Sequence, residues 1–317
     1  MMYKDYGDSG VQLSALGLGG HEYLPDGSSR GFNEHRGEAV KPGYTGEGYG
    51  GPQRIALIEQ AFEAGINFFD VTIDPEKEAL GRNLREVTIP HDIYIQTRPE
   101  GMGYGYDPGN RKMADAQLLR DEVERCLGLL QRDVIDILNF PFLQSALDED
   151  PDYLKKISAN VSELKDAGLV RFASADNFSG ESTYLTQIES GIFDSISINF
   201  NFANSAPLDK VIPAALGSGT GVLTREVFQK GALFMMGEEM GETDRSRLAR
   251  IAIKWNLSIQ GVSTTLIGAR NPSEFANALS VLESPDLTED ESNLLDQLLA
   301  TSTGSSYSEK RRKDFIS

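Results

Sequence analysis

Polar side chains that could do chemistry stand directly at the ends of short apolar runs along this chain. His21 and Tyr23 follow the first such run, Asp70 ends the second, and Arg98 follows the third. Carboxylates beside arginines take separated pKa values, so that one group serves as base and another as acid. If the fold brings these run ends together, the residue types predict acid–base chemistry such as elimination, isomerisation or hydrolysis. We therefore expect His21, Tyr23, Asp70 and Arg98 to be catalytic.

The later apolar runs are followed by a second polar group. It consists of Asp176 and Asn177, then Asn199, then Arg225 and Glu226. Amides, carboxylates and guanidinium groups recognise hydroxyl, carboxylate or phosphate groups. We expect these five residues to bind substrate, and the arginines favour a small anionic or sugar-like compound.

Structural roles remain open for the same charged residues. Arg98 could pair with Asp70, and Arg225 with Glu226, as simple salt bridges. Carboxylates at 76 and 78 suit the start of a helix, whose dipole favours acidic residues there. His21 lacks a second histidine at metal-ligand spacing, so we predict no metal site.

The elements that must position these residues alternate between two kinds. Runs of strand character are separated by segments of helical period, for example Leu119, Val123, Cys126, Leu127 and Leu130. The strand-like runs cover residues 13–18, 66–70, 92–97, 134–139, 169–174, 195–199, 221–224 and 263–267. Eight repeats of strand and helix in 317 residues predict an α/β fold, a (β/α)8 TIM barrel. In such a barrel the carboxyl ends of the strands form one catalytic mouth.

We expect a single domain over residues 1–317, with two departures from the repeat. A glycine-rich loop over residues 21–51 follows the first strand, so it should lie over the mouth as a lid whose Arg30, His35, Arg36, Tyr44 and Tyr49 contact a ligand. The charged, Ser-rich segment 302–317 should be a polar surface appendage, preceded by a short helix around 288–299.

Composition excludes several classes of protein. The net charge is −18, from 48 acidic and 30 basic residues, and it disfavours nucleic acid and anionic membranes as partners. No apolar run approaches the length of a membrane span, and the start of the chain is too polar and acidic for a signal peptide. The single cysteine, Cys126, forms no internal disulfide and indicates a reducing, cytoplasmic compartment.

Five stretches in the same order resemble the aldo-keto reductases. They are residues 6–20, which read YGDSGVQLSALGLGG, then 64–70, 133–139, 168–178 and 266–272. Together they span nearly the whole chain. The resemblance implies a barrel whose bottom is plugged by a β-hairpin, and NADPH-dependent reduction of carbonyls through Asp, Tyr, Lys and His.

Three of those four catalytic positions have changed. Asp70 matches the family's Asp, but no tyrosine stands about five residues later. The Lys at the end of the third strand is Arg98, and the His at the end of the fourth is Phe140 or Pro141. An arginine that stays protonated cannot relay a proton as the family's lysine does, although it can hold an anion.

The cofactor positions implied by the resemblance have also changed. The aromatic residue that stacks on the nicotinamide is Arg225, and the family's Gln on the sixth strand is Ser197. A guanidinium would repel an oxidised, cationic nicotinamide. The adenosine-binding stretch keeps Gly268 and Arg270, which are the expected cofactor-binding residues if NADP binds, but Glu274 replaces the expected Arg or Gln.

Three functions stay open at this stage. The first is an enzyme on an aldo-keto-reductase-like barrel that performs acid–base chemistry, of lyase, isomerase or hydrolase type, on a small polar substrate. The second is an NADPH-dependent oxidoreductase with a rearranged proton donor. The third is a non-catalytic binding barrel.

Overall fold

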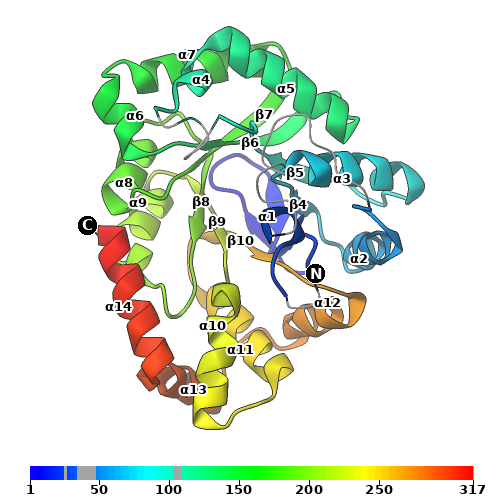
Figure 1. Cartoon of the computed structure of the whole chain (residues 1–317), viewed down its shortest axis with the longest axis vertical. Helices are drawn as coiled ribbons and strands as arrows, with labels where there is room; N and C mark the ends of the chain where they lie inside the picture. The colour runs from blue at the N-terminus through cyan, green and yellow to red at the C-terminus, as the bar shows by residue number, and fades with distance from the viewer. Residues whose placement is uncertain (25–26, 34–47, 103–106, 108, 317) are drawn as a thin grey trace.

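The structure is a computed structural model, and it describes residues 1–24, 27–33, 48–102, 107 and 109–316. Eight parallel strands close into a barrel in the order β10-β3-β4-β5-β6-β7-β8-β9. Figure 1 shows these strands at the centre, with helices arranged around them. The TIM barrel expected from the sequence is confirmed. His35, Arg36, Tyr44 and most of the expected lid lie outside the described residues.

The barrel strands are β3 (Leu16–Gly19), β4 (Phe68–Asp70), β5 (Tyr94–Thr97), β6 (Ile135–Pro141), β7 (Val170–Asp176), β8 (Ser195–Asn199), β9 (Gly221–Arg225) and β10 (Val262–Ile267). The helices that follow them in turn are α2 (Pro52–Glu63), α3 (Asp74–Glu86), α5 (Ala116–Leu130), α7 (Tyr153–Asp166), α8 (Glu181–Glu189), α9 (Val211–Gly217), α11 (Arg245–Ser258) and α12 (Pro272–Leu279). Additional helices are α1 (Arg30–Asn33), α4 (Arg111–Ala114), α6 (Gln144–Glu149), α10 (Ala232–Met240), α13 (Glu289–Ala300) and α14 (Ser302–Ile316), with 3-10 turns η2 (Ala206–Leu208), η3 (Gln229–Gly231) and η4 (Ser280–Glu283).

Local sequence explains where the main helices begin. The Asp115 side chain accepts a hydrogen bond from the backbone N–H of Leu118 at 3.0 Å and caps α5. Asn271 caps α12 in the same way through the N–H of Glu274, at 2.9 Å, and Pro272 fits the first helical position. These caps fix the residues at which the two helices begin: α12 starts shortly after β10 ends at Ile267, whereas a long connection that contains α4 separates β5 from α5.

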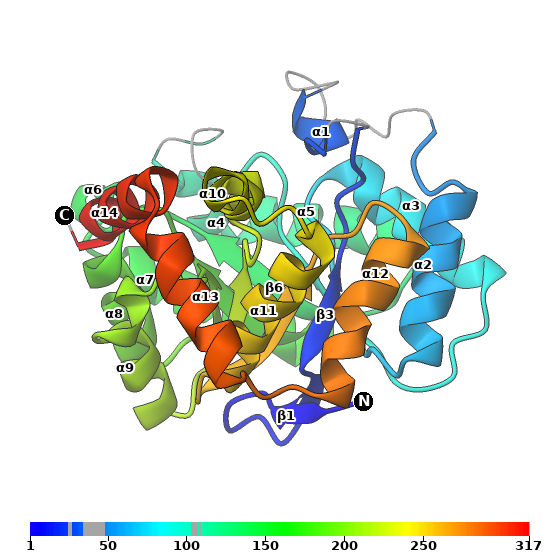
Figure 2. The same ribbon diagram turned by 90° about the horizontal axis from the view of Figure 1, so that it is seen from below.

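The first expected strand, over residues 13–18, is in fact two strands. Its first part belongs to β2 (Gln12–Ser14), which pairs with β1 (Tyr3–Asp5) in a separate antiparallel hairpin. The Tyr6 hydroxyl and Ser195 Oγ are hydrogen-bonded at 2.7 Å inside the barrel. Figure 2 shows β1 at the end of the barrel opposite α1, so the hairpin closes the bottom and leaves the other end as the mouth.

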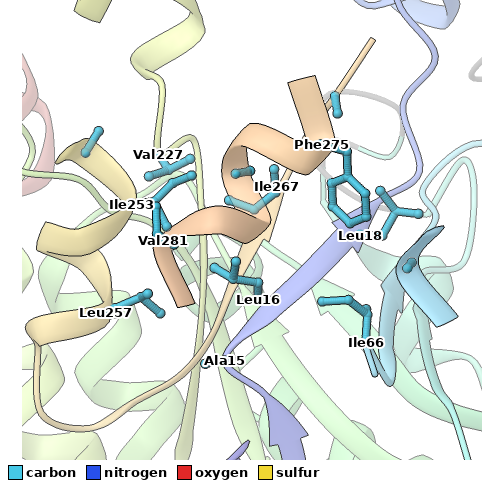
Figure 3. Close-up of a cluster of buried hydrophobic side chains, with 14 of the residues drawn as sticks. Ala15, Leu16, Leu18, Ile66, Val227, Ile253, Leu257, Ile267, Phe275 and Val281 are labelled. Atoms are coloured by element: carbon cyan, nitrogen blue, oxygen red, sulfur yellow. The ribbon is translucent and has the colours of Figure 1, made fainter. Parts of the chain in front are cut away.

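The main apolar cluster lies between the strands and the outer helices. Figure 3 shows Leu16 and Leu18 of β3 packed with Ile267 of β10, Ile253 of α11 and Phe275 of α12. Since side chains alternate along a strand, Gly17 and Gly19 face the barrel interior. A Cβ on Gly17 would lie 2.5 Å from the Phe68 ring, so the interior has no room for a side chain there.

The segment 302–316, expected to be a surface appendage, is the helix α14. It contacts α10, α13, α8 and η2, and Figure 2 shows it on the mouth side of the barrel, beside α10. Tyr307, Arg311 and Phe315 lie four residues apart and therefore share one face of the helix. Arg311 Nη2 is 3.2 Å from Glu226 Oε2. The Ser-rich composition of the segment did not indicate this packed helix face.

Candidate active site at the barrel mouth

The floor of the mouth is a chain of polar side chains above an apolar layer. Phe68, Ile137 and Leu223 fill the lower interior with the hairpin residues Tyr6 and Leu13. Two residues further along these three strands, the inward-facing side chains are polar. The barrel is therefore solid below and polar above.

Four of these polar side chains are linked directly. Gln96 Nε2 donates to Asp70 Oδ1 at 2.7 Å, and Ser197 Oγ donates to Gln96 Oε1 at 3.1 Å. Ser174 Oγ lies 3.3 Å from Ser197 Oγ. Burial raises the pKa of Asp70, and the Gln96 hydrogen bond and the charges of His21, Arg225 and Arg98 offset this only partly. Asp70 is thus a carboxyl group that takes up a proton more readily than an exposed one.

His21 is held by a buried carboxylate. Its Nδ1 lies 2.7 Å from Glu76 Oε1, and Glu76 Oε2 accepts hydrogen bonds from the backbone N–H groups of Thr72, at 3.1 Å, and Ile73, at 3.4 Å. Burial alone would lower the pKa of His21, but the charge and hydrogen bond of Glu76, together with the charge of Asp70, raise it above its ordinary value. The side chain of His21 remains 35% exposed while that of Glu76 is 1% exposed. The ring is thus oriented by a buried carboxylate and remains partly accessible.

Glu76 had an expected structural role, and the structure gives it a second one. It occupies the third position of α3, where its hydrogen bonds to the start of the helix fit the expected stabilisation of a helix terminus. Burial raises the pKa of Glu76, but the charge of His21, its hydrogen bond and the backbone donors outweigh this and lower it. Its contact with His21 joins the loop after β3 to the segment after β4.

Arg225 is fixed by the buried Asp176. Arg225 Nη1 donates to Asp176 Oδ2 at 2.6 Å, Nη2 donates to Oδ1 at 2.5 Å, and Nε donates to Asn199 Oδ1 at 2.6 Å. The alternative in which Arg225 pairs with Glu226 is wrong: Glu226 instead pairs with Lys230, at 2.9 Å, and with α14. Three predicted residues, Asp176, Asn199 and Arg225, therefore come together.

Arg98 lies near the same centre. Its charge affects the pKa of both His21 and Asp70, and that of Arg225 affects the pKa of Asp70, so both arginines lie within electrostatic reach of this carboxyl group. Glu100, two residues beyond Arg98, is buried, and this raises its pKa to about 7 against the opposing charges of Lys77 and Arg98. A neighbouring ion pair within α3, Lys77 with Asp74 at 3.0 Å, is fully buried.

Other expected site residues are placed differently. The amide of Asn177 is used within its own loop, since Oδ1 accepts from Ser179 N and Gly180 N and Nδ2 donates to Gln187. Asn177 thus holds the loop that follows β7. The Tyr23 hydroxyl lies against Gly268, in the space that a Cβ would fill, and burial raises its pKa to about 12.

Strand alternation also resolves the position left open at the end of β6. Ile137 packs inside the barrel, whereas Phe140 packs in the outer cluster beside Phe193, with ring centroids 5.9 Å apart. Pro141 therefore faces inward, level with Asp176 in the β7 register. Of the two residues left open at this position, Pro141 is therefore the one that faces the barrel interior, and its side chain has no titratable group.

The residues that would hold NADP do not fit that cofactor well. Arg225, which the resemblance matches to the residue that stacks on the nicotinamide, is paired with the buried Asp176. At the other end, Arg270 Nε donates to Glu274 Oε1 at 2.8 Å, so a carboxylate already takes the place of a 2′-phosphate. Tyr23 fills the space over Gly268.

No metal-ligating cluster of three His, Cys, Asp or Glu side chains occurs within the described residues. Within the same part of the chain, none of the helices combines the length and the apolar character needed to cross a bilayer.

Comparison with known proteins defines the class. A model of the aldo/keto reductase family matches residues 43–246, well over half of the chain, so this chain belongs to that family. The chain is also 24% identical over 268 residues to L-galactose dehydrogenase from Arabidopsis thaliana, an alignment that covers 76% of this chain and 81% of that protein.

Proposed function

We propose that this chain is an enzyme that performs acid–base chemistry, of lyase or isomerase type, on a small polyhydroxylated or anionic substrate without hydride transfer from a nicotinamide. The observation that carries the proposal is the His21–Glu76 pair beside Asp70. A histidine oriented by a buried carboxylate is the arrangement that general acid–base catalysis uses.

The proposed roles follow from the contacts. We assign proton exchange with the substrate to Nε2 of His21, because Glu76 engages Nδ1 and supports the positive charge. Asp70 serves as the second proton-transfer group, since its raised pKa brings it closer to neutral pH. Arg98 and Arg225 bind a carboxylate or a developing oxyanion.

A small sugar-like substrate is supported by two observations. The site combines guanidinium, carboxylate and amide groups, which exchange hydrogen bonds with neighbouring hydroxyls. The relative named above is a dehydrogenase of a hexose, L-galactose.

A second candidate is an NADPH-dependent reductase with a different proton donor. Membership of the family and the likeness to a dehydrogenase favour it. Against it stand the pairs Arg225–Asp176 and Arg270–Glu274, which occupy both ends of the expected cofactor site.

This function is tested without added cofactor, on a panel of candidate substrates. Aldonic and uronic acids are incubated with the protein in D2O, and proton NMR follows the loss of C–H signals through exchange or elimination. We expect at least one acid to react without added nucleotide, and His21→Asn to slow the reaction by about 100-fold or more. Glu76→Gln should slow it by about tenfold or more, because His21 keeps its ring but loses the carboxylate that orients it and supports its positive charge.

The matched control is His91→Asn. His91 Nε2 bonds to the Ile66 carbonyl at 2.9 Å, before the start of β5 and away from the mouth. This variant should react as the wild type does. Reaction only in the presence of NADPH, or an unchanged rate in His21→Asn, would overturn the proposal in favour of the reductase.

A further inference from the structure

Besides the proposed active site, the mouth has a hollow next to the Asp176–Arg225 pair, under the last turns of α14. The hollow is partly open to solvent. The loop after β7 contributes Phe178, the end of β8 contributes Asn199, and α14 contributes Arg311 and Asp314. The hollow therefore exists only because α14 packs over this side of the mouth.

One buried side chain in its wall has an unused hydrogen-bonding atom. Asn204 is 6% exposed, and its Nδ2 donates to the Asn199 carbonyl at 2.8 Å. Its Oδ1 is buried, and the chain as described supplies no hydrogen-bond donor to it. Leaving a buried carbonyl oxygen without a donor is unfavourable, so a hydroxyl group that donates to it would remove this cost.

The rest of the wall combines ring faces with charged groups. Phe178, Tyr184 and Phe315 supply aromatic surface, and the Tyr184 and Phe315 rings are 6.1 Å apart. Arg311 supplies N–H donors and Asp314 supplies carboxylate acceptors. Apolar ring faces with a few convergent polar groups suit a ring that has a flat C–H face and a rim of hydroxyls.

The hollow shares its inner wall with the proposed active site. Asn199 bonds to Arg225, and Tyr184 Oη lies 3.4 Å from Asp176 Oδ1. The guanidinium of Arg225 lies over the Phe178 ring, 5.5 Å from its centroid. A molecule bound against Arg225 would therefore touch one bound in the hollow.

We propose that this hollow is a second sugar-ring subsite, so that the substrate is a glycoside of at least two rings with the reacting ring at His21 and Asp70. The inference rests on the proposed function only in taking a polyhydroxylated substrate. Asn204 Oδ1 accepts a hydroxyl hydrogen bond from the second ring, Phe178 supports its C–H face, and Arg311 with Asp314 binds the outer hydroxyls.

The test measures binding of named sugars to the full chain by saturation-transfer NMR. The panel holds maltose, cellobiose, lactose, melibiose, sucrose and trehalose, together with glucose, galactose and fructose. We expect at least one disaccharide to bind at least tenfold more tightly than either of its component sugars. Asn204→Ala should remove that tenfold advantage and leave binding of the single sugars unchanged.

Two further variants keep the result interpretable. Asn293→Ala, on the exposed side of α13, is the matched control and should keep the disaccharide advantage. Should Asn204→Ala fail to fold, the double variant Arg311→Gln/Asp314→Asn tests the same wall from α14, with the same expected loss. No preference for any disaccharide, or a preference that survives in every subsite variant, overturns the proposal. Because binding is measured rather than turnover, loss of proton exchange in His21→Asn would leave this result unaffected.

Discussion

Single residues at the mouth were predicted better than their partners. Asp70, Arg98, Asp176 and Arg225 all reach the site, because each ends or follows a strand and strand ends can be read from local sequence. The partner of Arg225 is Asp176, however, 49 residues earlier in the chain. That pairing depends on how β7, β8 and β9 align across the barrel, which local patterns do not contain. Gln96 was not predicted as a site residue from the sequence. Alternation along β5 from Tyr94 would have placed its side chain inward, but its hydrogen bonds to Asp70 and Ser197 depend on the alignment of the strands.

The Arg225–Asp176 pair gives a stability prediction at this scale. Arg225→Met leaves a fully buried carboxylate without its two guanidinium donors, which should lower the free energy of unfolding by about 3–5 kcal/mol. Urea denaturation measures this. Arg245→Met, which breaks an exposed pair with Glu238, should cost less than about 1 kcal/mol. Equal losses in the two variants would show that the Asp176 pair is not a buried one.

The His21–Glu76 pair gives a pH prediction. The pKa of His21 is raised in the folded state, so the pair stabilises the fold fully below about pH 6.5 and loses this contribution as the pH rises through the folded pKa. The pKa of Glu76 is lowered, so Glu76 stays ionised across this window. The stability difference between wild type and Glu76→Gln should therefore shrink from pH 6 towards pH 9. NMR titration of the His21 ring should show a pKa that falls in Glu76→Gln, and an unchanged ring pKa would refute the pairing.

Whole elements followed the sequence closely where apolar patterns were strong. All eight barrel strands and the helix α13 lie where expected, since β-branched runs and apolar period identify buried strands and helices. The first run merged β2 with β3, because the short turn at Ala15 leaves no gap in the apolar pattern. The helix α14 was expected to be an appendage, because among its serines and charges few apolar side chains, Tyr307 and Phe315, pack on the core clusters.

The docking of α14 yields a prediction at the level of the element. A Cβ on Gly180, which has φ +101°, would lie 2.4 Å from the Phe315 carbonyl oxygen. Gly180→Ala should therefore destabilise the full chain through backbone strain and by pushing the end of α14 away. In a chain that ends at Glu309 only the strain remains, so the same substitution should cost less by about 1 kcal/mol or more. Thermal unfolding is measured for the full and the shortened chain, each with and without Gly180→Ala, as a double-mutant cycle. An equal loss of stability in the two chains would contradict the contact between Gly180 and Phe315.

At the scale of the whole molecule, the barrel gathers the polar side chains of its strand ends at one end. The hairpin closes the bottom, α14 borders the mouth, and arginines gather there in a chain whose net charge is −18. This architecture could be predicted from the strand count and from the resemblance to aldo-keto reductases. That residues 1–317 form a single domain stays a prediction, as does the lid expected over residues 21–51. The substrate was beyond reach, because it depends on side-chain pairs formed across the barrel.

The central claim is that this barrel has exchanged hydride transfer for acid–base chemistry, and titration with NADPH and NADP⁺ tests it most directly. Arg225 locked to Asp176 and Arg270 locked to Glu274 leave both ends of the cofactor without the groups it needs. Nicotinamide fluorescence, with calorimetry for the oxidised form, should show no saturable binding tighter than about 1 mM. A micromolar dissociation constant for either form, with a change in nicotinamide fluorescence on binding NADPH, would contradict the claim and identify the protein as a reductase.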